Sequence, residues 1–321
     1  MIDFSYLGEK VKNSPFLNSP YKHIYIENFL EDKHFQEIIT SFEIESPKNI
    51  NDDKELIDGL KDKGFKSISF PGAVTNVDEY LQWKKNGKIS KHMNSSCEGF
   101  GFVMRLYEIK TQILNSLNDY ISGKEFNKIL ADKFDIESFK ELVIDGGIQK
   151  YLDGYEISPH PDTRRKAITF MVNINPSNQS ESMNHHTNYM SLIDERKYVK
   201  EFWEGNPEID RVWLPWKWLK NEFTQNKNNS IVIFSPDNNT FHSVRAEYNH
   251  FTTQRTQLYG NLWYKNSIDK SISWEDLDLI SKSTLPKKTM RNKITSLLPN
   301  SVKQNLKKIL YKDSDTRERK I

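Results

Sequence analysis

A histidine and an aspartate two residues apart suggest a metal site in the middle of the chain. His160 and Asp162 are separated by one proline, and on an extended backbone residues two positions apart point to the same side. A second histidine would complete a set of two imidazoles and one carboxylate, which holds iron(II) on one side and leaves neighbouring coordination positions open. The best candidate is His242, which follows a Pro-Asp-Asn-Asn turn in the predicted strand 240–246.

Other interpretations of the histidines stay open at the level of sequence. A histidine with an aspartate two positions later arises easily by chance, and a histidine before Pro-Asp is often a turn residue. His185 and His186 compete for the third ligand position, but they lie in an Asn-rich, loop-like stretch where exposure to solvent is the simpler interpretation. His250, in a connection between predicted strands, is a minor alternative.

The order of these residues along the chain resembles a known enzyme family. His160-x-Asp162 is followed about 80 residues later by His242, and then by Arg255 at the start of an aromatic strand-like segment. This pattern resembles the 2-oxoglutarate/iron(II)-dependent dioxygenases, and within them the prolyl-4-hydroxylase-like group. The resemblance covers roughly residues 20–266.

The resemblance implies a fold, a set of cofactors and the metal ligands. The fold is a double-stranded β-helix, or jelly-roll, core with N-terminal helices packed on one side. The cofactors are iron(II), 2-oxoglutarate as cosubstrate and O2, with ascorbate in a supporting role. His160, Asp162 and His242 would ligate iron(II), and the presence of Asp162 favours hydroxylation over halogenation.

The resemblance also implies which residues contact the cosubstrate. Arg255 would hold the distal carboxylate of 2-oxoglutarate, for which a guanidinium group is geometrically suited. Tyr151, nine residues before His160, would donate a hydrogen bond to the same molecule. The interval from His242 to Arg255 is a few residues longer than is usual in the family, so Arg245 is a rival, but a position on the adjacent strand favours Arg255.

The sequence pattern places helices before strands. Residues 1–20 are polar and punctuated by prolines, which predicts an irregular lead-in. A short strand and an amphipathic helix are expected up to residue 42, followed by a loop-dominated stretch over 45–100. The spacing of Leu and Ile predicts a long helix from 103 to about 134, broken near Gly123.

Strand-like runs dominate residues 142–178 and 230–264. The region 183–229 has no steady period and is interpreted as a long insertion with a helical piece near 213–223, which would cover the site and select the substrate. Helices followed by strands indicate an α+β protein with an antiparallel sandwich or barrel. The oxygenase domain is therefore expected over residues 20–266.

The near-neutral charge of the chain conceals two different parts. Lys and Arg number 46 against 44 Asp and Glu, which gives a net charge of +2. Residues 281–321 hold 12 basic and 3 acidic residues, a net of +9, so the rest of the chain carries 2 − 9 = −7. This tail is predicted to form a basic amphipathic helix, either in peripheral contact with a membrane surface or packed on its own domain.

Composition limits the class of protein further. The single Cys97 excludes an internal disulfide framework and a cysteine-based zinc site. No apolar run reaches the length of a membrane-spanning helix, and the first residues lack the pattern of a signal peptide, so a cytoplasmic protein is expected. Oligomeric state is not predicted.

The favoured function is hydroxylation of a small molecule or glycan intermediate, in preference to a protein side chain. A non-catalytic jelly-roll binding module is one alternative. A nucleic-acid-associated protein that uses the basic tail is another, although the acidic body disfavours nucleic acid as a partner.

Overall fold

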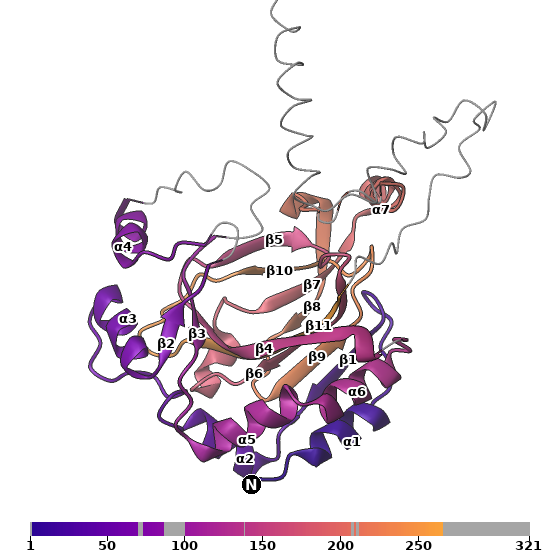
Figure 1. Cartoon of the computed structure of the whole chain (residues 1–321). Helices are drawn as coiled ribbons and strands as arrows, with labels where there is room; N and C mark the ends of the chain where they lie inside the picture. The colour runs from indigo at the N-terminus through magenta and orange to yellow at the C-terminus, as the bar shows by residue number, and fades with distance from the viewer. Residues whose placement is uncertain are drawn as a thin grey trace, which may run out of the picture. The chain divides into compact units, whose positions relative to one another are not determined.

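Two antiparallel β-sheets face each other at the centre of the protein (Figure 1). The computed structural model describes residues 2–69, 73–86, 100–137, 139–206, 209 and 212–265. The predicted basic tail at 281–321 lies outside the described residues. In the described part of the chain, no helix has the length and apolar character needed to cross a bilayer.

The larger sheet has seven strands and the smaller has four. In spatial order, the larger sheet consists of β1 (His23–Glu27), β9 (Ser230–Phe234), β6 (Lys166–Asn173), β11 (Arg255–Tyr264), β4 (Leu142–Tyr151), β3 (Val103–Leu106) and β2 (Phe65–Ser67). The smaller sheet consists of β5 (Glu156–His160), β10 (His242–Arg245), β7 (Thr187–Leu192) and β8 (Leu219–Gln225). Every pairing of strands is antiparallel.

Side-chain alternation along the central strands separates a hydrophobic core from a polar interior. In β6, Phe170 and Val172 belong to the core, whereas Thr169 and Met171 line a cavity between the sheets. The neighbouring β11 repeats the pattern, with Leu258 in the core and its alternate residues lining the same cavity. Because successive side chains of a strand point to opposite faces, one sheet supplies both the core and the floor of the site.

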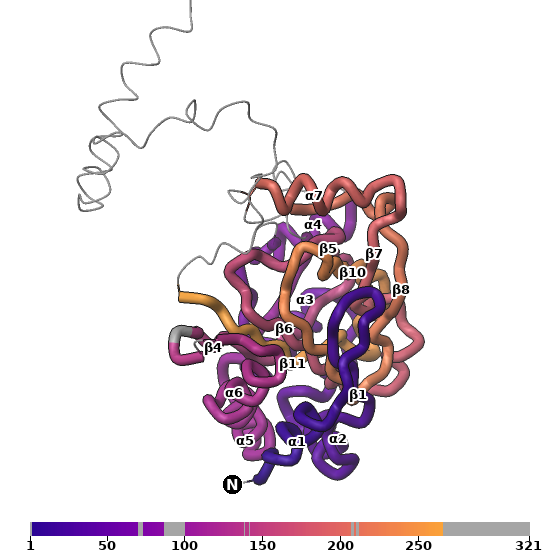
Figure 2. Tube along the Cα trace, turned by 90° about the vertical axis from the view of Figure 1, so that its right-hand side faces the viewer, coloured from indigo at the N-terminus to yellow at the C-terminus, as the bar shows by residue number. Residues whose placement is uncertain are grey.

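Helices cover the outer face of the larger sheet (Figure 1). They are α1 (Ser5–Asn13), α2 (Asp32–Ile39), α5 (Gln112–Ile121) and α6 (Lys124–Lys133). Their apolar faces complete the main core, in which Phe126 of α6 meets Phe170 edge to face at 5.7 Å between ring centroids. Figure 2 shows α7 (Tyr198–Glu204) at the opposite end of the molecule, near β5 and β10.

Three sequence expectations about the N-terminal half are wrong. Residues 1–20 are not an irregular lead-in, because Leu7 and Val11 form the buried face of α1. The stretch 45–100 contains α3 (Asp53–Asp62), β2 and α4 (Val77–Asn86), since a few buried residues such as Leu56 and Tyr80 suffice to anchor these polar elements. The predicted long helix begins only after β3, so its predicted start is wrong, whereas its predicted break near Gly123 is confirmed and separates α5 from α6.

The region 183–229 is part of the second sheet, so its interpretation as an insertion is wrong. It contributes β7 and β8, two of the four strands. Residues 213–223, expected to include a helical piece, instead form a single 3₁₀ turn at Trp216–Trp218 and the start of β8. These strands are hard to predict from the sequence because they are mostly polar. Only scattered residues such as Tyr189 and Gln225 are fully buried, so no regular apolar alternation marks the strands.

A close contact between β6 and β11 gives a stability prediction. Gly260 pairs with Phe170, and a Cβ at position 260 would lie 2.1 Å from Cζ of that ring. Overpacking of this kind costs about 1–3 kcal/mol, so Gly260→Ala is expected to lower the free energy of unfolding by that amount in urea denaturation. Adding Phe170→Leu should recover part of the loss; a double variant less stable than the sum of the two single changes would contradict this explanation.

Candidate metal centre

Two strands of the smaller sheet bring the proposed ligands together. His160 ends β5 and His242 begins β10, and the two residues are direct partners in the sheet register. Asp162 follows β5 by two residues. One candidate ligand atom from each of the three side chains lies within 4.8 Å of the others. All three residues are buried, with 7–8 % of their surface exposed.

Backbone carbonyls fix the orientation of both imidazoles. Nδ1 of His160 donates to the carbonyl oxygen of Ser158 at 2.7 Å, and Nδ1 of His242 donates to that of Thr240 at 2.9 Å. A carbonyl oxygen can only accept, so each Nδ1 carries the ring proton and each Nε2 keeps a lone pair. Metal-bound histidines are commonly oriented in this way.

The Asp162 carboxylate is held in its charged form. It accepts hydrogen bonds from Lys166 Nζ at 2.7 Å and Thr169 Oγ1 at 2.6 Å. Burial alone would raise its pKa, but the charge of Lys166 and the neighbouring His242 and His160 hold the pKa below its usual range. Burial also lowers the pKa of His160 to about 3, with a further contribution from His242. At neutral pH the site therefore presents two neutral nitrogen donors and one anionic oxygen.

A cavity of about 170 Å³ extends from these three residues to Arg255. Arg255 is 2 % exposed. Its Nη2 donates to Thr187 Oγ1 at 2.9 Å, and its guanidinium carbon lies 4.3 Å from the centroid of the Tyr151 ring. Nη1 is buried and has no hydrogen-bond partner among the described residues, and none of their carboxylates forms an ion pair with Arg255. Because an uncompensated buried charge is costly, the cavity is suited to an anionic ligand.

Tyr151 reaches the same cavity from β4. It is the register partner of Arg255, and its hydroxyl donates to Gln149 Oε1 at 2.7 Å. Burial raises the pKa of Tyr151 while the charge of Arg255 opposes the rise, so the phenol stays protonated. With its proton engaged by Gln149 in this structure, its oxygen retains acceptor capacity, and donation to a ligand would require the hydroxyl to rotate.

The alternative residues from the sequence lie elsewhere. His250 contacts Asp53 at 2.7 Å and accepts from the backbone N–H of Asp153 at 3.1 Å, outside the cavity lining. Arg245 forms an ion pair with Glu156 at 3.0 Å, and the Arg245 side chain is 45 % exposed. The structure therefore places Arg255, and not Arg245, in the cavity with the two histidines and the aspartate.

His185 and His186 are buried, so the expectation that they are solvent-exposed is wrong. His185 is fully buried, and neither of its ring nitrogens has a partner among the described residues. Its ring packs on His186 and on Tyr248, with centroids 4.4 Å and 4.6 Å apart. Burial lowers the pKa of His185 to about 2 and that of His186 to about 4, and the nearby charge of Arg255 adds to both effects.

These buried histidines predict a loss of stability in mild acid. Below about pH 6.5 both histidines become protonated in the unfolded chain but stay neutral in the folded protein. The free energy of unfolding therefore falls as pH falls. Each histidine contributes about 1.4 kcal/mol per pH unit in that window. Urea denaturation at pH 7.5 and 5.5 measures the loss, which should be smaller in a His185→Gln/His186→Gln variant; an undiminished loss would contradict the assignment.

Three residues that complete the site were not identified from the sequence. Lys166 and Thr169 hold the carboxylate of Asp162, and Thr187 accepts from Arg255. Lys166 and Thr169 are three residues apart, so the regular alternation of a strand would place them on opposite faces. The register of β6 against β11 shifts between Ile168 and Lys166, and both side chains reach Asp162. No local sequence pattern indicates this shift, and Thr187 was missed because its strand was not recognised.

Comparisons with known proteins give weak fold likenesses only. No protein-family model matches the chain, and no curated protein matches its sequence. A prolyl-4-hydroxylase from Pseudomonas putida aligns with a TM-score of 0.38 and 8% identity, over 82% of this chain and 99% of its own. A prolyl hydroxylase from Trichoplax adhaerens, solved with a hypoxia inducible factor peptide fragment, aligns with a TM-score of 0.38 and 9% identity, over 81% and 89%. EvdO2 from Micromonospora carbonacea var. aurantiaca has a TM-score of 0.28 and 10% identity, over 49% and 67%. At TM-scores below 0.5 we draw no functional inference from them.

Proposed function

We propose that the chain is an iron(II)- and 2-oxoglutarate-dependent oxygenase that hydroxylates its substrate. The observation that carries the proposal is the joint presence, in one small cavity, of His160, Asp162 and His242 and of a buried arginine without a carboxylate partner. Two imidazoles and one carboxylate are a donor set that suits iron(II) with open positions. Arg255 suits the far carboxylate of a dicarboxylic acid.

The strand order supports a jelly-roll interpretation of the core. From β4 to β11 the chain alternates between the larger and the smaller sheet, except that β7 and β8 are consecutive in the smaller one. This winding closes two sheets around the cavity and supports the proposed double-stranded β-helix. The first and last strands of the series, β4 and β11, pair along their whole length.

The residues of the chain have distinct parts in the proposed reaction. Bound iron(II) would allow O2 to oxidise 2-oxoglutarate to succinate and carbon dioxide, with one oxygen atom entering succinate and the other a substrate C–H bond. His160, Asp162 and His242 would hold the metal, with Lys166 and Thr169 keeping the carboxylate ionised and oriented. Arg255 and Thr187 would bind the distal carboxylate, and Tyr151 would pack against the cosubstrate and offer it a hydrogen bond.

Succinate release tests the proposal. The purified chain is incubated with iron(II), ascorbate and 2-oxoglutarate, and succinate is measured with and without metal. We expect metal-dependent release that is lost in the His160→Ala/Asp162→Ala variant. Equal release by this variant would contradict the metal assignment. A non-catalytic binding module would release none under any of these conditions.

A further inference from the structure

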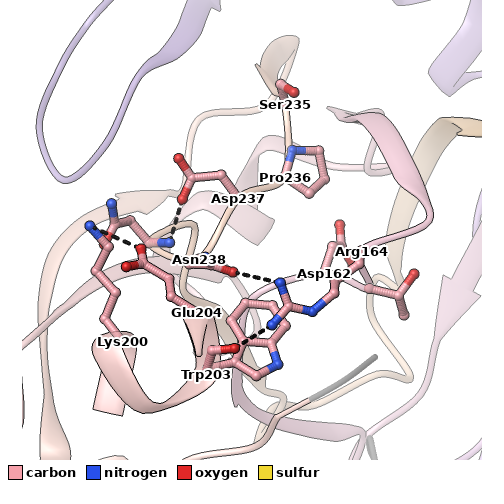
Figure 3. A pocket seen from close by; sticks show the side chains of 11 residues that line it. Asp162, Arg164, Lys200, Trp203, Glu204, Ser235, Pro236, Asp237 and Asn238 are labelled. Carbon is pink, nitrogen blue, oxygen red and sulfur yellow. Dashed lines mark hydrogen bonds and ion pairs between the residues drawn. The ribbon is translucent and has the colours of Figure 1, made fainter. Parts of the chain in front are cut away.

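A second and larger cavity lies beside the proposed metal centre (Figure 3). Its volume is about 310 Å³, and Asp162 lines both this cavity and the smaller one that contains Arg255. Three segments form its walls: the residues after β5, helix α7, and the turn at 235–239 after β9. A molecule bound here would have one end next to the proposed metal ligands.

The charged side chains of this cavity are engaged with the protein itself. Arg164 donates to the carbonyl oxygens of Ile209 and Trp203 and to Asn238 Oδ1, and its guanidinium group lies 4.2 Å from the Trp203 ring centroid. Lys200 pairs with Glu204 at 3.4 Å. Figure 3 shows Arg164 next to Asp162 on one side of the cavity and the Lys200–Glu204 pair on the other side. Neither cation is therefore set up to recruit an anionic ligand.

Neutral polar groups remain available to a ligand. The Thr163 hydroxyl is buried and has no hydrogen-bond partner among the described residues. In the same part of the structure, the side chains of Ser235 and Asn239 form no hydrogen bond, and Asn238 uses only its amide oxygen. Hydroxyl and amide groups both donate and accept, so this lining matches a ligand that does the same.

The lining also disfavours other classes of ligand. Its acidic residues are Asp162, Glu204 and Asp237 and its basic residues are Arg164 and Lys200, so three negative and two positive charges leave a net of −1, which opposes a phosphate or sulfate group. Among the described residues that line the cavity, the apolar ones are Trp203 and Pro236, and none is Leu, Ile, Val, Met or Phe. This limited apolar surface opposes a ligand that is apolar throughout.

We propose that this cavity binds the substrate, and that the substrate is a neutral polyhydroxylated compound such as a sugar or a cyclitol. The role as substrate rests on the proposed oxygenase function, whereas the binding preference rests only on the lining of the cavity. Thr163, Ser235, Asn238 and Asn239 would form hydrogen bonds with the hydroxyl groups. The C–H bond to be hydroxylated would lie at the end of the molecule nearest Asp162.

Ligand binding to the metal-free full chain tests the preference without any catalytic turnover. Saturation-transfer NMR is recorded with methyl α-D-glucopyranoside, sucrose and myo-inositol, and in parallel with inorganic phosphate (by calorimetry), putrescine and N-acetyl-L-prolinamide. We expect binding of at least one of the three polyols and of none of the other probes. Failure of all three polyols to bind, or binding of only a charged or prolyl probe, would overturn the proposal.

Two variants locate the binding. Thr163→Val removes a hydroxyl that has no partner in the protein, and Asn239→Ala removes an amide that makes no side-chain hydrogen bond, so neither should impair folding. Each is expected to weaken polyol binding about three- to tenfold, the value of one hydrogen bond. The matched changes Thr75→Val and Asn226→Ala, at exposed positions outside the cavity lining, should leave binding unchanged. Equal effects of the variants and their controls would overturn the proposal.

The two proposals fail in different ways. If iron(II) and 2-oxoglutarate yield succinate but no polyol binds, the substrate class is wrong and the oxygenase function stands. If a polyol binds through Thr163 and Asn239 but no metal-dependent succinate forms, the polyol site stands and its role in an oxygenase reaction is wrong.

Discussion

His242→Ala is expected to weaken iron(II) binding by more than about 100-fold, beyond the 10–100-fold typical of changes in the residues that only orient metal ligands. The variant removes one of the two nitrogen donors, and no described residue in the cavity can replace it, since the nearest rings to His242 are His160, Phe234 and Tyr189. Anaerobic calorimetric titration of the metal-free protein with iron(II) measures the change.

His23→Gln is a matched control for this variant. His23 is also buried, its Nδ1 also contacts a backbone carbonyl, that of Tyr21 at 2.8 Å, and burial also lowers its pKa. It lies on β1, outside the cavity lining. Iron(II) affinity should therefore be unchanged in His23→Gln. Retained affinity in His242→Ala, or an equal loss in both variants, would contradict the assignment of His242.

Arg255→Met is expected to weaken 2-oxoglutarate binding by about 30-fold or more, because truncating one partner of a buried charge pair costs about 2–5 kcal/mol. The same change should leave the free energy of unfolding within about 1 kcal/mol of the parent value, since it removes a buried cation that has no carboxylate partner in the described part of the chain. Calorimetry with iron(II)-loaded protein gives the affinity, and urea denaturation gives the stability.

Arg245→Met is the control for the arginine prediction. Arg245 is the last residue of β10, and its exposed side chain pairs with Glu156 and stacks on Trp216. Because this exposed pair contributes little, cosubstrate affinity and stability should both stay near the parent values. A large loss of affinity in Arg245→Met, with none in Arg255→Met, would reverse the choice between the two arginines.

Local sequence patterns were sufficient to predict the strongly apolar strands. The run SIVIF at 230–234 is almost entirely apolar and therefore predicts a strand. In the structure it forms β9, in which every residue is buried. Local patterns were insufficient for β7 and β8, in which Asn188, Lys220 and Asn221 interrupt the apolar pattern. Those strands form because β7 pairs with β10 across a distance of over fifty residues in sequence, and no local window contains that information.

The candidate site also contains some features that local sequence predicts and others that depend on long-range contacts. The two-residue spacing of His160 and Asp162 is a local feature, so the sequence alone could indicate that they converge. The choice of Arg255 depends on register, because its pairing with Tyr151 directs it into the cavity. The burial of His185 depends on packing against Tyr248, more than sixty residues away, and the polar residues around it suggest the opposite.

The location of bound metal tests the central claim most directly. Crystals of the full chain grown anaerobically with iron(II) are to be measured with X-rays at the iron absorption edge. The proposed site predicts one strong anomalous peak within coordination distance of Nε2 of His160, Nε2 of His242 and a carboxylate oxygen of Asp162. A peak at any other group of side chains, or no peak at saturating iron(II), would contradict it.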